Sequence, residues 1–438
     1  MLNSVVRFLK SQEKFNFLVI FLAISGFLPI PASNIAVLIG FIYTVIFFKK
    51  PIIWNTLLAL PILLFFWIVT SFFWSMQPML TLYSIPRTVF LLVIPLLFLA
   101  IKFDTTHVKE SVLKTYSYLA VVVSMAFLIR AIIRFFVYKN SSVFFNHGNY
   151  ISDMGLVPKN LNAVHVSAFV AIAFFYFLTT KKKGIYNWLC VFILAVFLVL
   201  LSSSIVLFTC LFLLLLYFFF FSKSANRMRL RNSVLVLILA LILGFYKQTK
   251  DYINEEFKTN TEKVIGHNVI PELSKTNHKV TLYEAWNNEQ FSPNDFFPAL
   301  AFRIYQFRMC LEIIKEEKAF WEGLGFNASQ IKLEEKGIKY NVFLGDTINE
   351  GYQKKNFHNQ YVQVFVELGF IGFTHLMLLL FFSLKKALQS KDFIHIAFTI
   401  LMISLFLTES FLWRQRGVVF FTVFYCLFMT QPKLTTTK

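Results

Sequence analysis

Runs of apolar residues alternate with short polar segments along almost the whole chain. A helix needs around 20 apolar residues to cross about 30 Å of hydrocarbon, and about twelve of these runs approach that length. We therefore predict an all-α polytopic membrane protein in which each run forms one transmembrane helix. The predicted spans cover roughly residues 15–30, 34–48, 53–74, 84–101, 112–137, 161–180, 185–202, 205–221, 232–246, 359–384, 393–412 and 418–430.

One long polar segment, residues 246–357, interrupts this pattern between the ninth and tenth predicted spans. It is too long for a passive connector. Its first half has no periodicity, so we expect that half to be irregular and mobile. Its second half predicts an amphipathic helix over residues 301–318, which would lie along the membrane surface or cap the bundle. The apolar stripe of this helix follows Pro298 and consists of Ile304, Phe307, Leu311 and Ile314.

These elements divide the chain into three parts: residues 1–245 with nine spans, residues 246–357 as a loop domain, and residues 358–438 with three spans and a short tail. The composition agrees, because 57% of the residues are hydrophobic and only 15% are charged. Soluble domains carry roughly a quarter charged residues, so a soluble globular protein is excluded. Cys310 is the one cysteine of the loop domain, and no Cys-x-x-Cys or His/Cys metal spacing occurs, so we expect no disulfide in that domain and no metal site.

The net charge of +19 is unevenly distributed. Residues 246–357 hold 15 Lys and Arg against 16 Asp and Glu, whereas the rest of the chain holds 27 basic and 7 acidic residues. The excess basic residues lie in clusters between apolar runs, which is the positive-inside pattern of membrane topology. This distribution does not indicate a nucleic-acid site. It predicts a cytoplasmic location for both termini and an outer location for the loop domain. The clusters are Arg7/Lys10/Lys14, Lys49/Lys50, Lys102/Lys109/Lys114, Lys181 to Lys183, Lys223/Arg227/Arg229/Arg231, Lys385/Lys386/Lys391 and Lys433/Lys438.

Ionisable residues inside the predicted spans gather toward the outer face. They include Glu367, Glu409, Arg130 and Arg134. Such residues indicate function, and their position favours chemistry at the outer leaflet over a pathway across the membrane. A transporter remains an alternative, although two related halves and helix breaks near mid-membrane are not evident. A passive scaffold is the other alternative.

Three short motifs resemble the O-antigen ligase and polymerase family. The first is His358-Asn359-Gln360-Tyr361 with Glu367, Gly369 and Gly372. The second is Arg303 and Phe307, followed by an acidic amphipathic helix and Gly323-Leu324-Gly325. The third is Thr408-Glu409-Ser410 with Arg414, which is similar to versions seen in the Bacteroidetes.

This resemblance implies a metal- and cofactor-independent glycosyltransferase of the bacterial inner membrane. It would move a glycan from undecaprenyl diphosphate to an acceptor hydroxyl on the periplasmic face. The preferred interpretation is an O-antigen ligase that acts on lipid A-core. A polysaccharide polymerase and an O-linked protein oligosaccharyltransferase share the motifs and stay open as alternatives.

The motifs also imply roles for individual residues. His358, at the start of a span, is the candidate general base, because a neutral imidazole accepts a hydroxyl proton. Arg303 is the candidate diphosphate ligand, because a guanidinium keeps its charge and offers paired donors. Arg308 is its competitor, but five residues of separation turn a helix by about 140°, so both cannot easily serve one site.

The remaining candidates are assigned to substrate binding or to its support. Asn359 adjoins the base, and Glu367 and Glu409 are expected to orient cations, since a carboxylate near hydrocarbon needs a partner. Gly369 and Gly372 lie on one helix face, where they are expected to allow close helix packing.

The sequence departs from the family at one position. Many members carry an arginine after a serine between the seventh and eighth spans, and none follows Ser204 here. A second phosphate contact is therefore unassigned. Arg414 is the first substitute, and Arg416, Lys159 and Arg134 follow.

Overall fold

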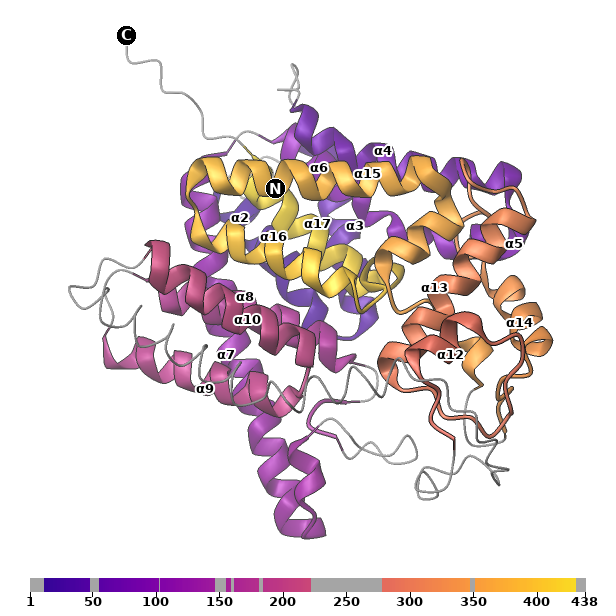
Figure 1. The fold of residues 1–438 in the computed structure, drawn as a ribbon. Coiled ribbons are helices and arrows are strands. Elements are labelled where there is room, and N and C mark those ends of the chain that lie inside the picture. Colours follow the sequence, from indigo (N-terminus) through magenta and orange to yellow (C-terminus); the bar gives the residue numbers. More distant parts are fainter. Residues whose placement is uncertain are drawn as a thin grey trace.

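The computed structural model describes residues 12–47, 55–101, 103–145, 155–158, 161–180, 184–221, 278–346 and 351–430. Within these ranges the chain forms helices and no strand, and an isolated β-bridge joins Lys279 and Phe296. The all-α prediction is therefore confirmed for the described part of the chain (Figure 1).

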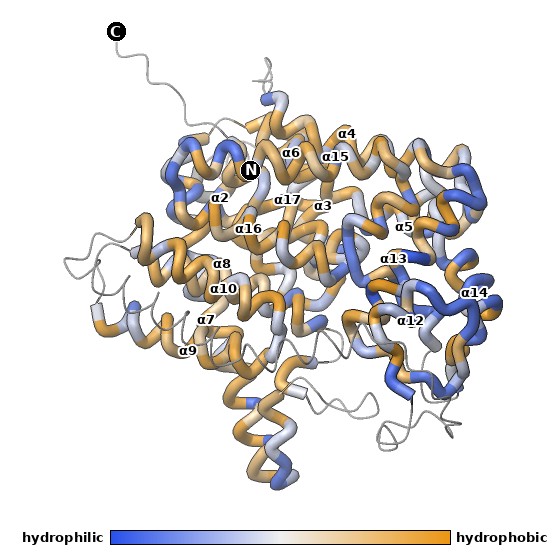
Figure 2. The backbone as a smooth tube through the Cα atoms, in the orientation of Figure 1, coloured by the Kyte–Doolittle hydropathy of each residue, from blue (hydrophilic) through white to orange (hydrophobic). Residues whose placement is uncertain are grey.

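A bundle of apolar helices forms the larger part of the molecule (Figure 2). Two helices, α8 and α17, lie at its centre, where nearly every side chain is buried. Around them, α8 packs against α7, α9 and α16, and α15 packs against α4 and α16. The helices are α2 (Gln12–Ile24), α3 (Ile30–Phe47), α4 (Thr56–Thr70), α5 (Pro78–Ser84), α6 (Phe90–Ala100), α7 (Thr105–Tyr138), α8 (Ala163–Thr179), α9 (Ile185–Leu201), α10 (Ser204–Leu216), α15 (Gln360–Ser390), α16 (Phe393–Phe406) and α17 (Gln415–Met429).

These helices coincide with eleven of the predicted spans. Among the described residues, 5 helices are long and apolar enough to cross a membrane, and six shorter apolar helices accompany them. The span predicted at 84–101 begins earlier, at Pro78, and is interrupted by the short helix η3 (Ile85–Thr88). The ninth span, at 232–246, lies outside the described residues, so the count of twelve stays a prediction. The basic clusters at 7–10, 49–50, 102, 181–183, 223–231 and 433–438 also lie outside them.

The described part of the loop domain, residues 278–346 and 351–357, has a hydrophobic core of its own. It contains α12 (Leu282–Asn287), α13 (Ala299–Glu316), α14 (Gln330–Lys339) and the short helix η7 (Tyr352–Lys354). An irregular conformation was predicted for the first half of the loop domain, of which residues 246–277 lie outside the described residues. That prediction is wrong at residues 282–287, which form α12 with a capping box between Thr281 and Glu284.

The predicted amphipathic helix is present as α13, but the core covers only half of the predicted stripe: Ile314 is buried and Ile304 is partly buried against the core. Phe307 and Leu311 are 41% and 42% exposed. The buried face also contains Tyr305, Met309 and Ile313, which pack into the core of the loop domain. Helix α13 carries apolar residues on more than one face, and the sequence pattern therefore did not determine which face the domain covers.

A backbone contact joins the loop domain to α15. Gly369 breaks α15 with φ 67° and ψ −169°, a conformation that is essentially restricted to glycine. A Cβ on Gly369 would overlap the backbone of Trp321, and one on Gly323 would overlap the backbone of Glu367. Leu324 N donates to Val366 O at 2.9 Å, and Gly325 N donates to Glu367 O at 2.9 Å. The expectation of close helix packing at Gly369 is therefore wrong, because a loop makes the close approach.

Candidate active site

His358 occupies a sharp turn immediately before α15. Its φ of 45° lies in the left-handed region, and its backbone N donates to Asn356 Oδ1 at 3.0 Å. Asn359 caps the helix, since its Oδ1 accepts from Tyr361 N at 2.9 Å and Val362 N at 3.1 Å. Its Nδ2 donates to Leu407 O at 3.2 Å. Asn359 thus fixes the turn that carries His358 and ties it to the end of α16.

Arg303 lies in the second turn of α13 and connects the loop domain to the segment between α16 and α17. Its Nη1 donates to Ala299 O at 2.9 Å, and its Nη2 donates to Thr408 O at 3.2 Å. Its Nε is buried without a hydrogen-bond partner among the described residues. Burial lowers the pKa of Arg303, and the charge of Glu409 raises it.

The environment of His358 favours the neutral imidazole. Burial, followed by the positive charges of Arg303, Lys355 and Arg414, lowers the pKa of His358 to about 4. The ring also lies edge-on to Phe302, with centroids 6.3 Å apart. A histidine that stays neutral far below pH 7 can accept a proton at physiological pH.

Two carboxylates occupy different surroundings. Glu409, 7% exposed, lies within electrostatic range of Arg303 and Arg414. Glu367, 2% exposed, accepts from Ser329 Oγ at 2.9 Å and from Gln363 Nε2. The structure thus brings Glu409 to the cations, whereas Glu367 joins α15 to the start of α14.

Arg308 does not join this group. Its Nε donates to Glu312 Oε1 at 2.9 Å, its Nη1 to Asn288 O at 2.7 Å and its Nη2 to the Tyr340 hydroxyl at 3.1 Å. Lys336 donates to the same carboxylate at 2.6 Å. Arg308 instead takes part in a hydrogen-bond network inside the loop domain, because its position lies about 140° around the axis of α13 from that of Arg303. Its assignment to substrate binding therefore has no support in this placement.

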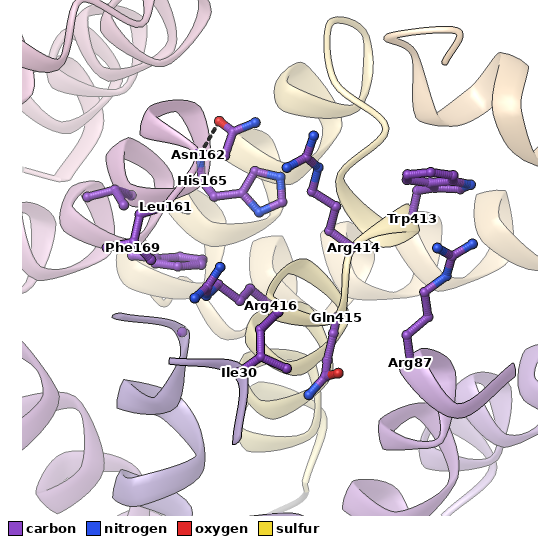
Figure 3. A pocket seen from close by; sticks show the side chains of 12 residues that line it. Ile30, Arg87, Leu161, Asn162, His165, Phe169, Trp413, Arg414, Gln415 and Arg416 are labelled. Atoms are coloured by element: carbon purple, nitrogen blue, oxygen red, sulfur yellow. Dashed lines mark hydrogen bonds between the residues drawn. The ribbon is translucent and has the colours of Figure 1, made fainter. Parts of the chain in front are cut away.

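Arg414 also lines a cavity of about 350 Å³ (Figure 3). It is bordered by η1 (Ser25–Phe27), the start of α3, η3, the start of α8, η8 (Phe411–Trp413) and the start of α17. Arginines and a histidine line it together with apolar side chains, and no acidic side chain does. The lining residues are Gly26, Ile30, Arg87, Leu161, Asn162, His165, Val166, Phe169, Trp413, Arg414, Gln415 and Arg416.

Arg414 is the residue common to the cavity and the His358 group. Its charge lowers the pKa of His358, and its side chain is exposed. Arg416 also lines the cavity, where its Nη2 donates to Leu28 O at 3.1 Å. Of the other proposed substitutes, Lys159 lies outside the described residues, and Arg134, near the end of α7, does not line the cavity.

Sequence reasoning missed two of the lining residues, Arg87 and His165. Both lie inside predicted spans, at 84–101 and 161–180. An ionisable residue in a span is itself a functional signal, and that signal would have found both. Among the described residues, no three His, Cys, Asp or Glu side chains gather at a spacing that holds a metal ion.

Comparison with known proteins finds a family similarity over part of the chain. The family model described as O-antigen ligase matches residues 188–377. This range contains Arg303, His358 and Glu367, whereas Arg87, His165 and Arg414 lie outside it. No curated protein matches the chain significantly in sequence. The chain is an all-α, multi-pass membrane protein, and its residues 188–377 are similar to the O-antigen ligase family.

Proposed function

We propose that the protein transfers a glycan from undecaprenyl diphosphate to the hydroxyl of lipid A-core, as an O-antigen ligase of the bacterial inner membrane. The observation that carries this proposal is the placement of His358 at the start of α15, buried and within electrostatic range of Arg303 and Arg414, which together lower its pKa. A general base next to fixed cations suits attack by a hydroxyl on a carbon whose leaving group is a diphosphate.

The proposed reaction is a single displacement. The acceptor oxygen attacks the anomeric carbon of the donor glycan and gives its proton to the imidazole of His358. The bond between the anomeric carbon and the diphosphate oxygen breaks, and the electron pair leaves with undecaprenyl diphosphate. Arg303 and Arg414 stabilise the charge that develops on this leaving group. Glu409 orients both cations.

The proposed orientation places His358 and the loop domain in the periplasm. The 31 residues of α15 span roughly 45 Å at 1.5 Å per residue, which exceeds the hydrocarbon thickness. The lysines Lys385, Lys386 and Lys391 lie at the opposite end of this helix from His358. Lys109, at the start of α7, pairs there with Asp392. Both termini would then face the cytoplasm, with the bases on the positive inside.

Deletion of the gene in its host tests the choice of acceptor. Loss of a ligase leaves long glycans on the undecaprenyl carrier and bare lipid A-core, and this is the expected pattern. Single repeat units attached to core would instead identify a polymerase. Normal lipids with unglycosylated proteins would identify an O-linked protein oligosaccharyltransferase. Either of the last two patterns would reject the ligase and keep the chemistry of His358. Unchanged glycans on all acceptors would reject the transferase.

A further inference from the structure

Gln363 is a buried polar residue in the first part of α15, next to the turn that carries His358. Its side chain is 3% exposed. Its Oε1 accepts from Phe357 N at 3.3 Å and from Ser410 Oγ at 3.3 Å. Phe357 directly precedes His358, and Ser410 directly follows Glu409. One amide oxygen therefore holds both the segment with the candidate base and the segment with the carboxylate near the cations.

The other end of the same amide contacts the loop domain and the middle of α15. Gln363 Nε2 donates to Glu367 Oε1 and, at 3.5 Å, to Ser329 Oγ, and this hydroxyl donates to Glu367 Oε1 at 2.9 Å. All three side chains are buried. A backbone N–H can only donate and an ionised carboxylate can only accept, so Phe357 N and Glu367 fix the orientation of the amide.

Two further buried glutamines hold the backbone of the same segments. Gln306, on α13, donates through Nε2 to Asn356 O and, at 3.4 Å, to Lys355 O. Gln360 accepts from Leu412 N at 2.6 Å through Oε1. The Oε1 of Gln306 is buried without a partner among the described residues. Gln363, in contrast, has partners at both ends of its amide, and a buried network in which every group is paired is rigid.

The turn at His358 requires such support. A φ of 45° is uncommon for a residue other than glycine, and such a conformation persists only where the surrounding structure fixes it. The hydrogen bond from Phe357 N to Gln363 fixes the residue immediately before this turn. The hydrogen bond between Asn359 Nδ2 and Leu407 O fixes the residue immediately after it.

Stability alone does not account for an amide at this position. A buried leucine of similar size would avoid the cost of removing a polar group from water, and hydrogen bonds contribute little net stability because water replaces them in the unfolded chain. Precise placement is different, because a displacement of about 1 Å at a reacting group can cost about 100-fold in rate.

We propose that Gln363 is a positioning residue for the reaction: its amide fixes the peptide of Phe357 and the hydroxyl of Ser410, and thereby holds the imidazole of His358 in place relative to Glu409. It acts through these groups and needs no contact with the substrate. The effect on the reaction rests on the proposed function, whereas the effect on the environment of His358 does not.

Four variants of the full-length protein in lipid nanodiscs test this role. Gln363→Leu removes the amide, and Gln363→Glu places a second carboxylate against Glu367. The double variant Gln363→Glu/Glu367→Gln exchanges the two groups, so that the pair again consists of one carboxylate and one amide. Gln330→Leu is the matched control, because the amide of Gln330 lies on α14 and donates to Gln353 O at 2.8 Å. The melting temperature of each variant verifies folding.

Two readouts separate positioning from folding. The first is kcat and KM for glycan transfer. The second is the pH dependence of the reaction of His358 with diethyl pyrocarbonate, followed by peptide mass mapping. This reagent modifies the neutral imidazole, so its rate reports the protonation of His358 without any transfer reaction.

We expect Gln363→Leu to lower kcat by about 10- to 100-fold while KM stays within about twofold. The midpoint of the His358 reaction should rise from about pH 4 toward 6.5, because a loosened turn exposes the ring to water and the burial that lowers its pKa is lost. The charges of Arg303, Lys355 and Arg414 also act on this ring, and none of them changes in the variant. Gln330→Leu should keep the wild-type kcat and midpoint.

The exchanged pair provides the rescue. Gln363→Glu should lose activity because two carboxylates meet in a buried site, and the double variant should recover most of the lost kcat. A wild-type kcat and midpoint in folded Gln363→Leu, or a lower melting temperature as its only change, would overturn the proposal. If Gln363→Leu does not fold, a double variant no more active than Gln363→Glu would overturn it. A raised midpoint in Gln363→Leu, together with full transfer by His358→Ala, would support the positioning role and reject the general-base assignment.

Discussion

The acid limb of the pH–rate profile should fall near pH 4, well below the usual range of a histidine. Activity requires the neutral imidazole, so the rate rises as pH rises through the pKa of His358. With a pKa of about 4, about 97% of the base is neutral at pH 5.5. With the ordinary value of 6.5, only about 9% would be neutral at that pH. The difference at pH 5.5 is therefore about tenfold in kcat/KM.

The same reasoning predicts the effect of a neighbouring charge. Arg303 is the first positive charge, after burial, that lowers the pKa of His358. Arg303→Gln should therefore move the acid limb to higher pH, in addition to lowering the maximal rate. Arg308→Gln is the matched control, because Arg308 lies on the same helix and contacts Glu312 and Tyr340 instead. Its profile should keep the wild-type midpoint.

The assay measures kcat/KM for glycan transfer in nanodiscs between pH 3.5 and 8, because kcat/KM reports the pKa of the free enzyme. Stability at each pH is verified by returning samples to neutral pH and measuring the recovered rate. A midpoint near 6.5 in the wild type would refute the argument that burial and cations set the protonation state. An unshifted midpoint in Arg303→Gln would refute the role of that charge.

Three further predictions concern the scaffold and its orientation. Gly369→Ala should lower the free energy of unfolding by at least about 3 kcal/mol, measured by thermal unfolding in detergent, because the backbone conformation and the Trp321 contact both exclude a Cβ. The control Gly184→Ala, with no neighbouring atom within 4 Å, should lower it by less than about 1 kcal/mol. Equal losses in the two variants would contradict the argument. Arg308→Gln should lower the melting temperature of the loop domain while kcat of the folded fraction stays within about twofold, and a large loss of kcat would return Arg308 to the site. Cysteines introduced in place of Lys339 and Gln389, which are both exposed, should respond oppositely to a membrane-impermeant thiol reagent in cells with a permeable outer membrane. The topology predicts labelling at position 339 alone. Labelling at position 389 alone would contradict it.

The helical bundle could be predicted because each apolar run is about as long as the hydrocarbon is thick. Boundaries were harder where backbone detail decides them, as at Ile85–Thr88, where a short 3-10 helix interrupts a run that hydropathy alone does not divide. The stripe predicted for α13 was half wrong for a related reason, since Phe307 and Leu311 are exposed whereas Ile304 and Ile314 contact the core. Periodicity identifies an apolar face, but only the fold determines which of two apolar faces the core covers.

The candidate site was partly predictable. Motif spacing selected His358 and Arg303, which lie 55 positions apart in sequence and are brought within electrostatic range by the fold. Helical geometry separated Arg308 from Arg303 in advance. Arg87 and His165 were overlooked although each is an ionisable residue in an apolar run, and the sequence does not say which cavity either one lines. The role of the Gly-x-Gly motif likewise could not be predicted, because it depends on the close contact of its backbone with α15.

Glycan transfer by His358→Ala is the most direct test of the central claim. The variant is expressed in the deletion strain at the wild-type protein level, and transfer from undecaprenyl diphosphate to the acceptor is measured in isolated membranes. His375→Ala, a histidine farther along α15, is the matched control. Loss of a general base costs about 10² to 10⁴ in rate, so the account predicts a loss of that size in His358→Ala and a wild-type rate in His375→Ala. A wild-type rate in His358→Ala would contradict the account.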